Sequence, residues 1–235
     1  MVREYVAKPR ITALLDLLES FYGTLQPHAP TEPYEFLIWW HCGYPASEER
    51  CDKGWSSLRR EVGIAPKQLG AASTAALTRA LKAGGMVPKL RAARLREIAA
   101  RVQDEFGGDL HAALARLSAE QVRKALKTFP GIGNPGADRI ALFARLSPLA
   151  AVPSACPYVL VRVLDGPEGD KYAAIYAAAQ RALSTLPATF EARIRAYLLL
   201  ALHGRELCKR SRPLCERCPL RPHCAFANRS KNQQY

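Results

Sequence analysis

The chain has 235 residues, 49% of them hydrophobic, so it is long enough to bury one or two hydrophobic cores. It carries 34 lysines and arginines against 21 aspartates and glutamates, and the resulting net charge of +13 favours a polyanionic partner. These values exclude a disordered tail, a collagen and a secreted disulfide-rich miniprotein. By charge alone, an ordinary basic surface is as good an interpretation as nucleic-acid binding.

The expected location follows from what the chain lacks. Its first residues contain no apolar segment of a signal peptide, and its longest apolar run, at 196–203, is shorter than the ~20 residues of a membrane span. We therefore expect a cytoplasmic protein without a membrane partner, associated with the nucleoid if the source is bacterial. Seven cysteines in that compartment predict thiols, a metal or a cluster rather than disulfides.

Helical periodicity extends along most of the chain. Apolar residues recur every three or four positions, and no sustained alternation of apolar and polar residues is present, so we expect an all-α fold. Glycines and prolines separate the helical segments. The predicted helices, in chain order, are at 11–21, 33–40, 58–62, 74–82, 89–106, 109–117, 118–126, 137–145, 172–183 and 188–203.

A short segment near the C-terminus holds Cys208, Cys215, Cys218 and Cys224, with the spacing C-x6-C-x2-C-x5-C. Four thiolates this close repel one another unless a cation holds them, so the spacing predicts a zinc ion or an iron–sulfur cluster. Spacing alone does not choose between the two, and four free thiols are the remaining alternative.

The loop between the first two of these cysteines is strongly basic. It contains Lys209, Arg210 and Arg212, and a fixed loop that presents such side chains suits contact with phosphates. The alternative is a solvated basic segment.

A glycine-rich turn, FPGIGNPG, occupies residues 129–136 between two predicted helices. Gly131 and Gly133, on either side of Ile132, permit a tight turn, and the amides that begin the next helix can face an anion. The pattern predicts a helix–hairpin–helix that binds the DNA backbone, and its alternative is an ordinary turn between helices.

Four segments together resemble endonuclease III and the helix–hairpin–helix DNA glycosylase superfamily. They are PYEFLI at 33–38, FPGIG at 129–133, LHGR at 202–205 and the cysteine spacing, all in family order, and the resemblance covers about residues 10–225.

The resemblance implies two helical domains with double-stranded DNA, damaged or structured, in a cleft between them. One is a six-helix barrel carrying the hairpin, at 36–151, and the other joins 1–35 to 152–235 around a [4Fe–4S] cluster. The cysteines would bind the cluster, the hairpin and the basic loop would bind DNA, and the protein is expected to be a monomer.

Three prolines depart from the family pattern. Bifunctional members have a nucleophilic lysine where this chain has Pro135 and an inserted glutamine where it has Pro45, and nearly all members have an aspartate where it has Pro157. Proline supplies no nucleophile, carboxylate or amide. Asp138, one helical turn beyond Pro135, or Asp165, just beyond Arg162 and Val163, could reach the pocket. Asp138 is the candidate for a catalytic role, with a structural role at the start of a helix as the alternative.

The same resemblance brings the segments around these prolines to one cleft, with His41, Cys42, Tyr44, Cys156 and Tyr158. The tyrosines could stack on a base, His41 could act as a general base and a cysteine as a nucleophile. Alternatively, the cysteines are small buried residues and the tyrosines belong to a core.

Three functions remain open on these grounds. The first is a protein of the base-excision-repair glycosylase superfamily that acts on or recognises damaged DNA with atypical catalytic residues. The second is a catalytically inactive DNA- or lesion-binding protein on the same scaffold. The third is an iron–sulfur redox or zinc module without a role on nucleic acid.

Overall fold

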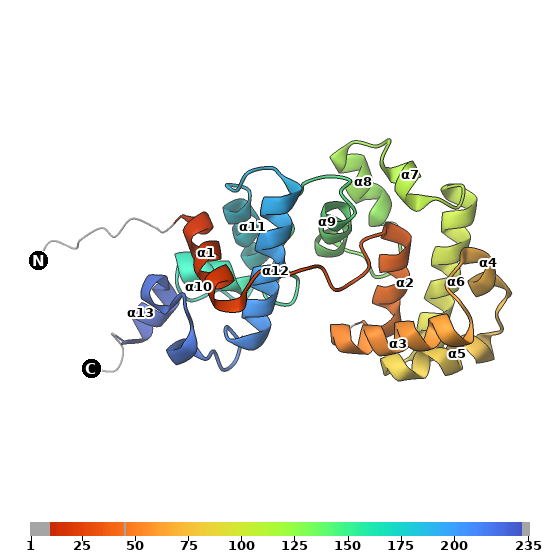
Figure 1. The fold of residues 1–235 in the computed structure, drawn as a ribbon, viewed down its shortest axis with the longest axis horizontal. Coiled ribbons are helices and arrows are strands. Elements are labelled where there is room, and N and C mark those ends of the chain that lie inside the picture. The colour runs from red at the N-terminus through yellow and green to blue at the C-terminus, as the bar shows by residue number, and fades with distance from the viewer. Residues whose placement is uncertain (1–9, 45, 232–235) are drawn as a thin grey trace, which may run out of the picture. The chain divides into compact units, whose positions relative to one another are not determined.

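The computed structural model describes residues 10–44 and 46–231, and the all-α prediction is confirmed: the described residues contain thirteen α-helices and no strand (Figure 1). They divide into two units. One is Pro27–Ser147, and the other is formed by the described parts of Met1–Gln26 and Pro148–Tyr235. None of the described helices is long and apolar enough to cross a membrane.

The continuous unit begins with helix α2, which packs on helix α3. Helix α2 also contacts the long helix α6, whereas α3 contacts α5 and the 3-10 turn η1. Helices α8 and α9 form a packed pair at its C-terminal end, and the hairpin connects them. The helices of this unit are α2 (Pro33–Gly43), α3 (Glu48–Glu61), α4 (Pro66–Ala71), α5 (Thr74–Leu81), the 3-10 turn η1 (Lys82–Gly84), α6 (Pro88–Glu105), α7 (Leu110–Leu114), α8 (Ala119–Leu126) and α9 (Asn134–Phe143).

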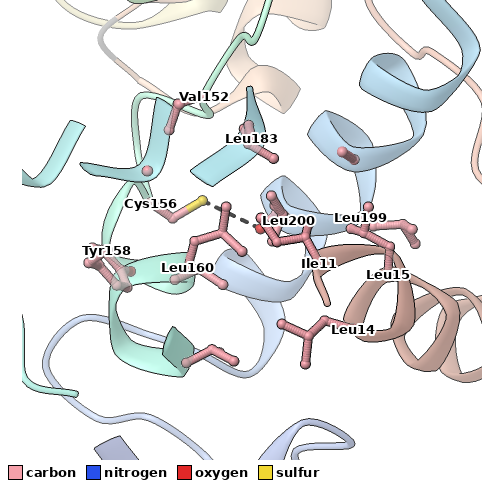
Figure 2. Close-up of a cluster of buried hydrophobic side chains, with 14 of the residues drawn as sticks. Ile11, Leu14, Leu15, Val152, Cys156, Tyr158, Leu160, Leu183, Leu199 and Leu200 are labelled. Carbon is pink, nitrogen blue, oxygen red and sulfur yellow. Dashed lines mark hydrogen bonds between the residues drawn. The ribbon is translucent and has the colours of Figure 1, made fainter. Parts of the chain in front are cut away.

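The discontinuous unit packs the N-terminal helix α1 on helix α12, and helix α10 contacts α11, α12 and α13 (Figure 1). Its core contains leucines from α1, α10 and α12 around Cys156 (Figure 2). The helices are α1 (Ile11–Tyr22), α10 (Tyr158–Leu164), α11 (Tyr172–Leu183), α12 (Phe190–Glu206), the 3-10 turns η2 (Cys215–Arg217) and η3 (Arg221–His223), and α13 (Ala225–Lys231).

The sequence prediction missed helices that carry many charges or few residues. Helix α3 begins at Glu48, ten residues before the predicted start at 58. Its first two turns were not predicted because they expose mostly charged side chains and bury only Cys51 and Gly54. The short helices α4, α10 and α13 were not predicted, since seven residues or fewer give too little periodicity.

Candidate functional site

The predicted hairpin is a tight turn whose apolar residues face inwards. Phe129 and Ile132 are buried, whereas Gly131, Gly133 and Asn134 are exposed. Gly131 has a φ of +69°, a left-handed conformation that glycine adopts without strain. The two buried side chains therefore anchor the turn, and its backbone is presented to solvent.

Helix α9 starts directly after this turn, with Gly133 as its N-cap and Pro135 in its first turn. The first amides of a helix have no partner within it, and the helix dipole makes this end positive. The exposed backbone around Gly133 and Asn134 can therefore receive an anion such as phosphate. Pro135 has no N–H to offer, and it holds the helical φ angle that the first turn requires.

Side chains from α2 and α6 hold the hairpin in place. His41 Nε2 is 2.8 Å from the carbonyl oxygen of Pro130, and Arg101 of α6 donates to the carbonyl and, at 2.9 Å, to the hydroxyl of Thr128. The Arg101 guanidinium also lies 5.0 Å from the centre of the Phe129 ring. These contacts come from residues far apart in the sequence, so only the packed unit fixes the turn.

His41 is buried, and this burial lowers its pKa to about 4. The imidazole is therefore neutral at pH 7, and its Nε2 must carry the proton because the carbonyl of Pro130 can only accept. The predicted role as a general base would have to use Nδ1. In this structure the residue acts as a brace for the hairpin.

The C-terminal end of α2 is clamped by Arg91, whose buried guanidinium donates to the carbonyls of Cys42 and Gly43, each at 3.1 Å. Tyr44 follows as the C-cap residue and is 39% exposed, with its ring stacked on Trp40 at 4.2 Å between centroids. The clamp therefore presents an exposed aromatic ring at a fixed position. Pro45, the next predicted site residue, lies outside the described residues.

An exposed apolar segment that was not predicted from the sequence lies beside this clamp. Met86 is 78% exposed and Val87 is 55% exposed, and Val87 has a φ of +52°, which is strained for a β-branched residue. The preceding turn is in tight contact with α2, since a β-carbon on Gly84 would lie 1.7 Å from the carbonyl oxygen of Cys42. The sequence signal was an apolar pair between glycine and proline, where a loop is normally polar.

A second missed residue is Arg94 of α6. A β-carbon added to Gly131 would lie 3.2 Å from Cε1 of His41 and 3.7 Å from Nη1 of Arg94. The Arg94 guanidinium thus lies beside the hairpin glycine and adds positive charge where the exposed backbone could receive phosphate.

The cysteines outside the predicted ligand set are buried in the unit to which each belongs. Burial raises the pKa of the Cys51 and Cys156 thiols to about 12, and raises that of Cys42 even further. Cys156 belongs to the core of the discontinuous unit, where its thiol donates to the carbonyl of Leu200 at 3.5 Å (Figure 2). All three are neutral thiols and poor nucleophiles at pH 7.

Asp138, the predicted catalytic candidate, is fully buried on α9. Its carboxylate accepts a hydrogen bond from Arg123 Nε of α8 at 2.6 Å. The pair joins the two helices of the hairpin motif.

Pro157 is buried as the N-cap of α10, so it begins that helix. Tyr158, the next residue, is only 5% exposed, and the guanidinium of Arg162 lies 4.5 Å from the centre of its ring. Of the two tyrosines proposed to stack on a base, only Tyr44 offers its ring to solvent.

The four cysteines of the predicted ligand set line one small pocket in the discontinuous unit, together with Arg162, His203 and apolar side chains. His203 Nε2 lies 3.5 Å from Cys218 Sγ, and Arg162 Nη1 donates to Cys208 Sγ at 3.9 Å. Burial raises the pKa of the Cys208 thiol to about 11 and also raises those of Cys218 and Cys224. Without a bound cation these thiols are therefore protonated at pH 7, and a metal would displace their protons.

Arg162 connects this pocket to the basic loop. It is 4% exposed, forms a bidentate pair with Glu168 at 2.5 and 2.6 Å, and donates to the carbonyls of Lys209 at 3.0 Å and Arg210 at 2.8 Å. One buried guanidinium therefore fixes the backbone of the loop through two carbonyls. The side chains of Lys209, Arg210 and Arg212 remain exposed.

Comparison with known proteins shows where this architecture occurs. No family model and no curated protein sequence matches the chain. A solved endonuclease III–DNA complex matches with a TM-score of 0.74 at 20% identity, covering 97% of this chain and 99% of that chain. A thermostable thymine-DNA glycosylase matches with a TM-score of 0.73 at 19% identity, covering 94% of this chain and 97% of that one.

A third match is the H. pylori 3-methyladenine DNA glycosylase bound to 1,N6-ethenoadenine. Its TM-score is 0.57 at 17% identity, and it covers 82% of this chain and 93% of that chain. At these identities the matches establish the architecture. The chain has the all-α fold of the endonuclease III-like DNA glycosylases.

Proposed function

We propose that this protein binds double-stranded DNA through its phosphate backbone and recognises damaged sites. The observation that carries the proposal is the hairpin, whose exposed backbone at Gly131 and Gly133 precedes the positive end of α9 and lies beside Arg94. Backbone amides and a helix terminus contact phosphate oxygens, which are the same in every sequence, so we expect binding with little sequence preference. The solved endonuclease III complex shows that a protein of this fold binds DNA.

The exposed residues at the end of α2 are the proposed lesion-contacting surface. Tyr44 presents a ring on which an unstacked base could stack, and Met86 and Val87 add exposed apolar side chains on the neighbouring turn. An undamaged duplex offers no unstacked base, so these contacts would favour a damaged or distorted site.

We propose that the four cysteines hold a [4Fe–4S] cluster. The described residues contain no group of three His, Cys, Asp or Glu side chains arranged to hold a single ion, yet the four cysteines line one pocket with two nitrogen donors at their sulfurs. Nitrogen donors at the ligand sulfurs are a feature by which proteins tune iron–sulfur clusters, and this supports the cluster. When bound, the cluster would supply a one-electron redox centre and a crosslink at the base of the loop.

The basic loop is the second proposed contact with the DNA backbone. Arg162 holds its backbone, and the exposed Lys209, Arg210 and Arg212 project from it. If all three contact phosphates, replacing them with glutamate should weaken binding to every sequence and lower the salt dependence of log K by about 2.7. A matched control reverses the exposed Lys67, Lys82 and Lys171, which changes the net charge equally.

The lyase chemistry of bifunctional glycosylases is not part of this proposal. Pro135 offers no amine for a Schiff base, and Asp138 is buried in an ion pair. We therefore expect no borohydride-trapped adduct on abasic DNA. Release of a base from a panel of damaged duplexes would instead assign a glycosylase activity, and equal affinity for damaged and undamaged DNA would contradict lesion recognition.

A further inference from the structure

A chain of two hydrogen bonds leads from the N-terminal helix to one of the proposed cluster ligands. The hydroxyl of Tyr22, in the last turn of α1, lies 3.1 Å from Nδ1 of His203. The other ring nitrogen, Nε2, lies 3.5 Å from Sγ of Cys218. His203 is 0% exposed and Tyr22 is half-buried, so the histidine that links the two hydrogen bonds is shielded from solvent.

The proton positions in this chain follow from the chemistry of its ends. A cysteine that binds iron is a thiolate and can only accept a hydrogen bond. His203 must then carry its proton on Nε2 for the 3.5 Å contact to be favourable, which leaves Nδ1 unprotonated. Nδ1 can only accept in that state, and the hydroxyl of Tyr22 is the donor that satisfies it. The tyrosine therefore selects the ring form that donates to sulfur.

We propose that Tyr22 and His203 form a hydrogen-bond relay to Cys218 that raises the reduction potential of the cluster. The inference rests on the proposed [4Fe–4S] site and adds a role for two residues that are not ligands. A hydrogen bond to a ligand sulfur withdraws electron density from it, which stabilises the reduced state more than the oxidised one. Tyr22 does not touch a cysteine, so it acts as a positioning residue through His203.

The relay also ties the cluster to the first helix of the chain. Helix α1 packs on α12 through its buried leucines, and Tyr22 makes an edge-on contact with the His203 ring, with centroids 6.0 Å apart. Tyr22, near the N-terminal end of the sequence, thus orients the N–H donor at Cys218, a ligand nearly 200 positions later. An altered position of α1 would change the potential without changing any ligand.

Tyr22→Phe tests the relay, because it removes the hydroxyl and keeps the ring. The purified holoprotein is measured by protein-film voltammetry, and we expect a shift of the cluster potential to more negative values with unchanged iron content. The matched control is Tyr34→Phe, which removes a hydroxyl that donates to the carbonyl of Ile64 in the other unit. An equal potential in Tyr22→Phe and wild type overturns the relay.

A measurement on the wild-type protein covers the case in which Tyr22→Phe does not fold. The iron–sulfur(cysteine) stretching bands in resonance Raman spectra should shift on exchange into D2O if an N–H donates to a ligand sulfur. His203→Leu removes the donor at Cys218 and should reduce that shift to the part contributed by Arg162 at Cys208. The absence of any shift overturns the relay. A wild-type protein that binds DNA but holds no iron overturns both the cluster and the relay, whereas a cluster with an unchanged potential in Tyr22→Phe overturns the relay alone.

Discussion

The hairpin and the cysteine loop both present positive groups, but they are built in different ways. The hairpin is anchored by apolar burial of Phe129 and Ile132, by a hydrogen bond from the neutral His41 and by contacts from the partly exposed Arg101. The loop after Cys208 has little apolar anchorage and is held by the buried, charged side chain of Arg162. The hairpin therefore forms as its unit folds, whereas the conformation of the cysteine loop depends on the Arg162–Glu168 pair and, in our proposal, on a bound cluster.

The largest effect that would test this difference is expected from Arg162→Met. The substitution leaves the half-buried Glu168 carboxylate without its partner and two loop carbonyls without a donor. We expect a loss of about 3–5 kcal/mol in the free energy of unfolding, measured by urea denaturation, together with loss of iron.

Arg195→Met is the matched control for that change. Arg195 pairs with Asp16 and Glu19 in the same unit, and this pair is more exposed to solvent than the Arg162 pair. Its loss should therefore lower the free energy of unfolding by about 1 kcal/mol or less. If both variants lose the same stability, the cysteine loop does not depend on the buried charge.

The hairpin unit should instead respond to acid through His41. Its pKa is lowered in the folded state to about 4, so the unfolded chain binds a proton first as the pH falls below about 6.5. The contribution of the neutral His41 to the free energy of unfolding is therefore complete above pH 6.5. Between pH 6.5 and pH 4 it decreases by about 1.4 kcal/mol for each pH unit.

His41→Gln removes this titration while its amide can still donate to Pro130. The stability difference between variant and wild type, measured by urea denaturation, should therefore shrink as the pH falls from 6.5 to 5. A difference that is constant over this range would show that the protonation of His41 is not linked to folding.

The smallest effect concerns the left-handed turn of the hairpin. Gly131→Ala should cost about 1–2 kcal/mol because an L-residue is strained at this φ, and the new β-carbon would press on the His41 ring. Gly107→Ala, in the same unit, places an alanine at a similar φ of +63° with no atom within 4 Å of the new β-carbon. Both variants should lose comparable stability, but only Gly131→Ala should weaken DNA binding in a fluorescence-anisotropy titration. Equal DNA binding by the two would remove the hairpin from the proposed interface.

The helical fold and the two sequence motifs could be predicted because their signals are local. The leucines of α1 repeat with the helical period and are buried as expected, and the glycines at 131 and 133 stand in the exposed turn that they predict. The cysteine spacing likewise predicted one site, and the four side chains line one pocket. The candidate pocket residues were harder to place, because exposure is a property of packing rather than of spacing.

What the sequence determined by itself is therefore the helical type of the longer elements and the grouping of four cysteines in one short segment, since both depend on neighbours within a few residues. Only the tertiary structure decided which charged side chains are buried and what they hold. Arg91 reaches two carbonyls of α2 nearly fifty positions away, and Arg162 reaches a loop at a similar separation. A buried charge is stable only with partners, and those partners come together only when distant helices pack.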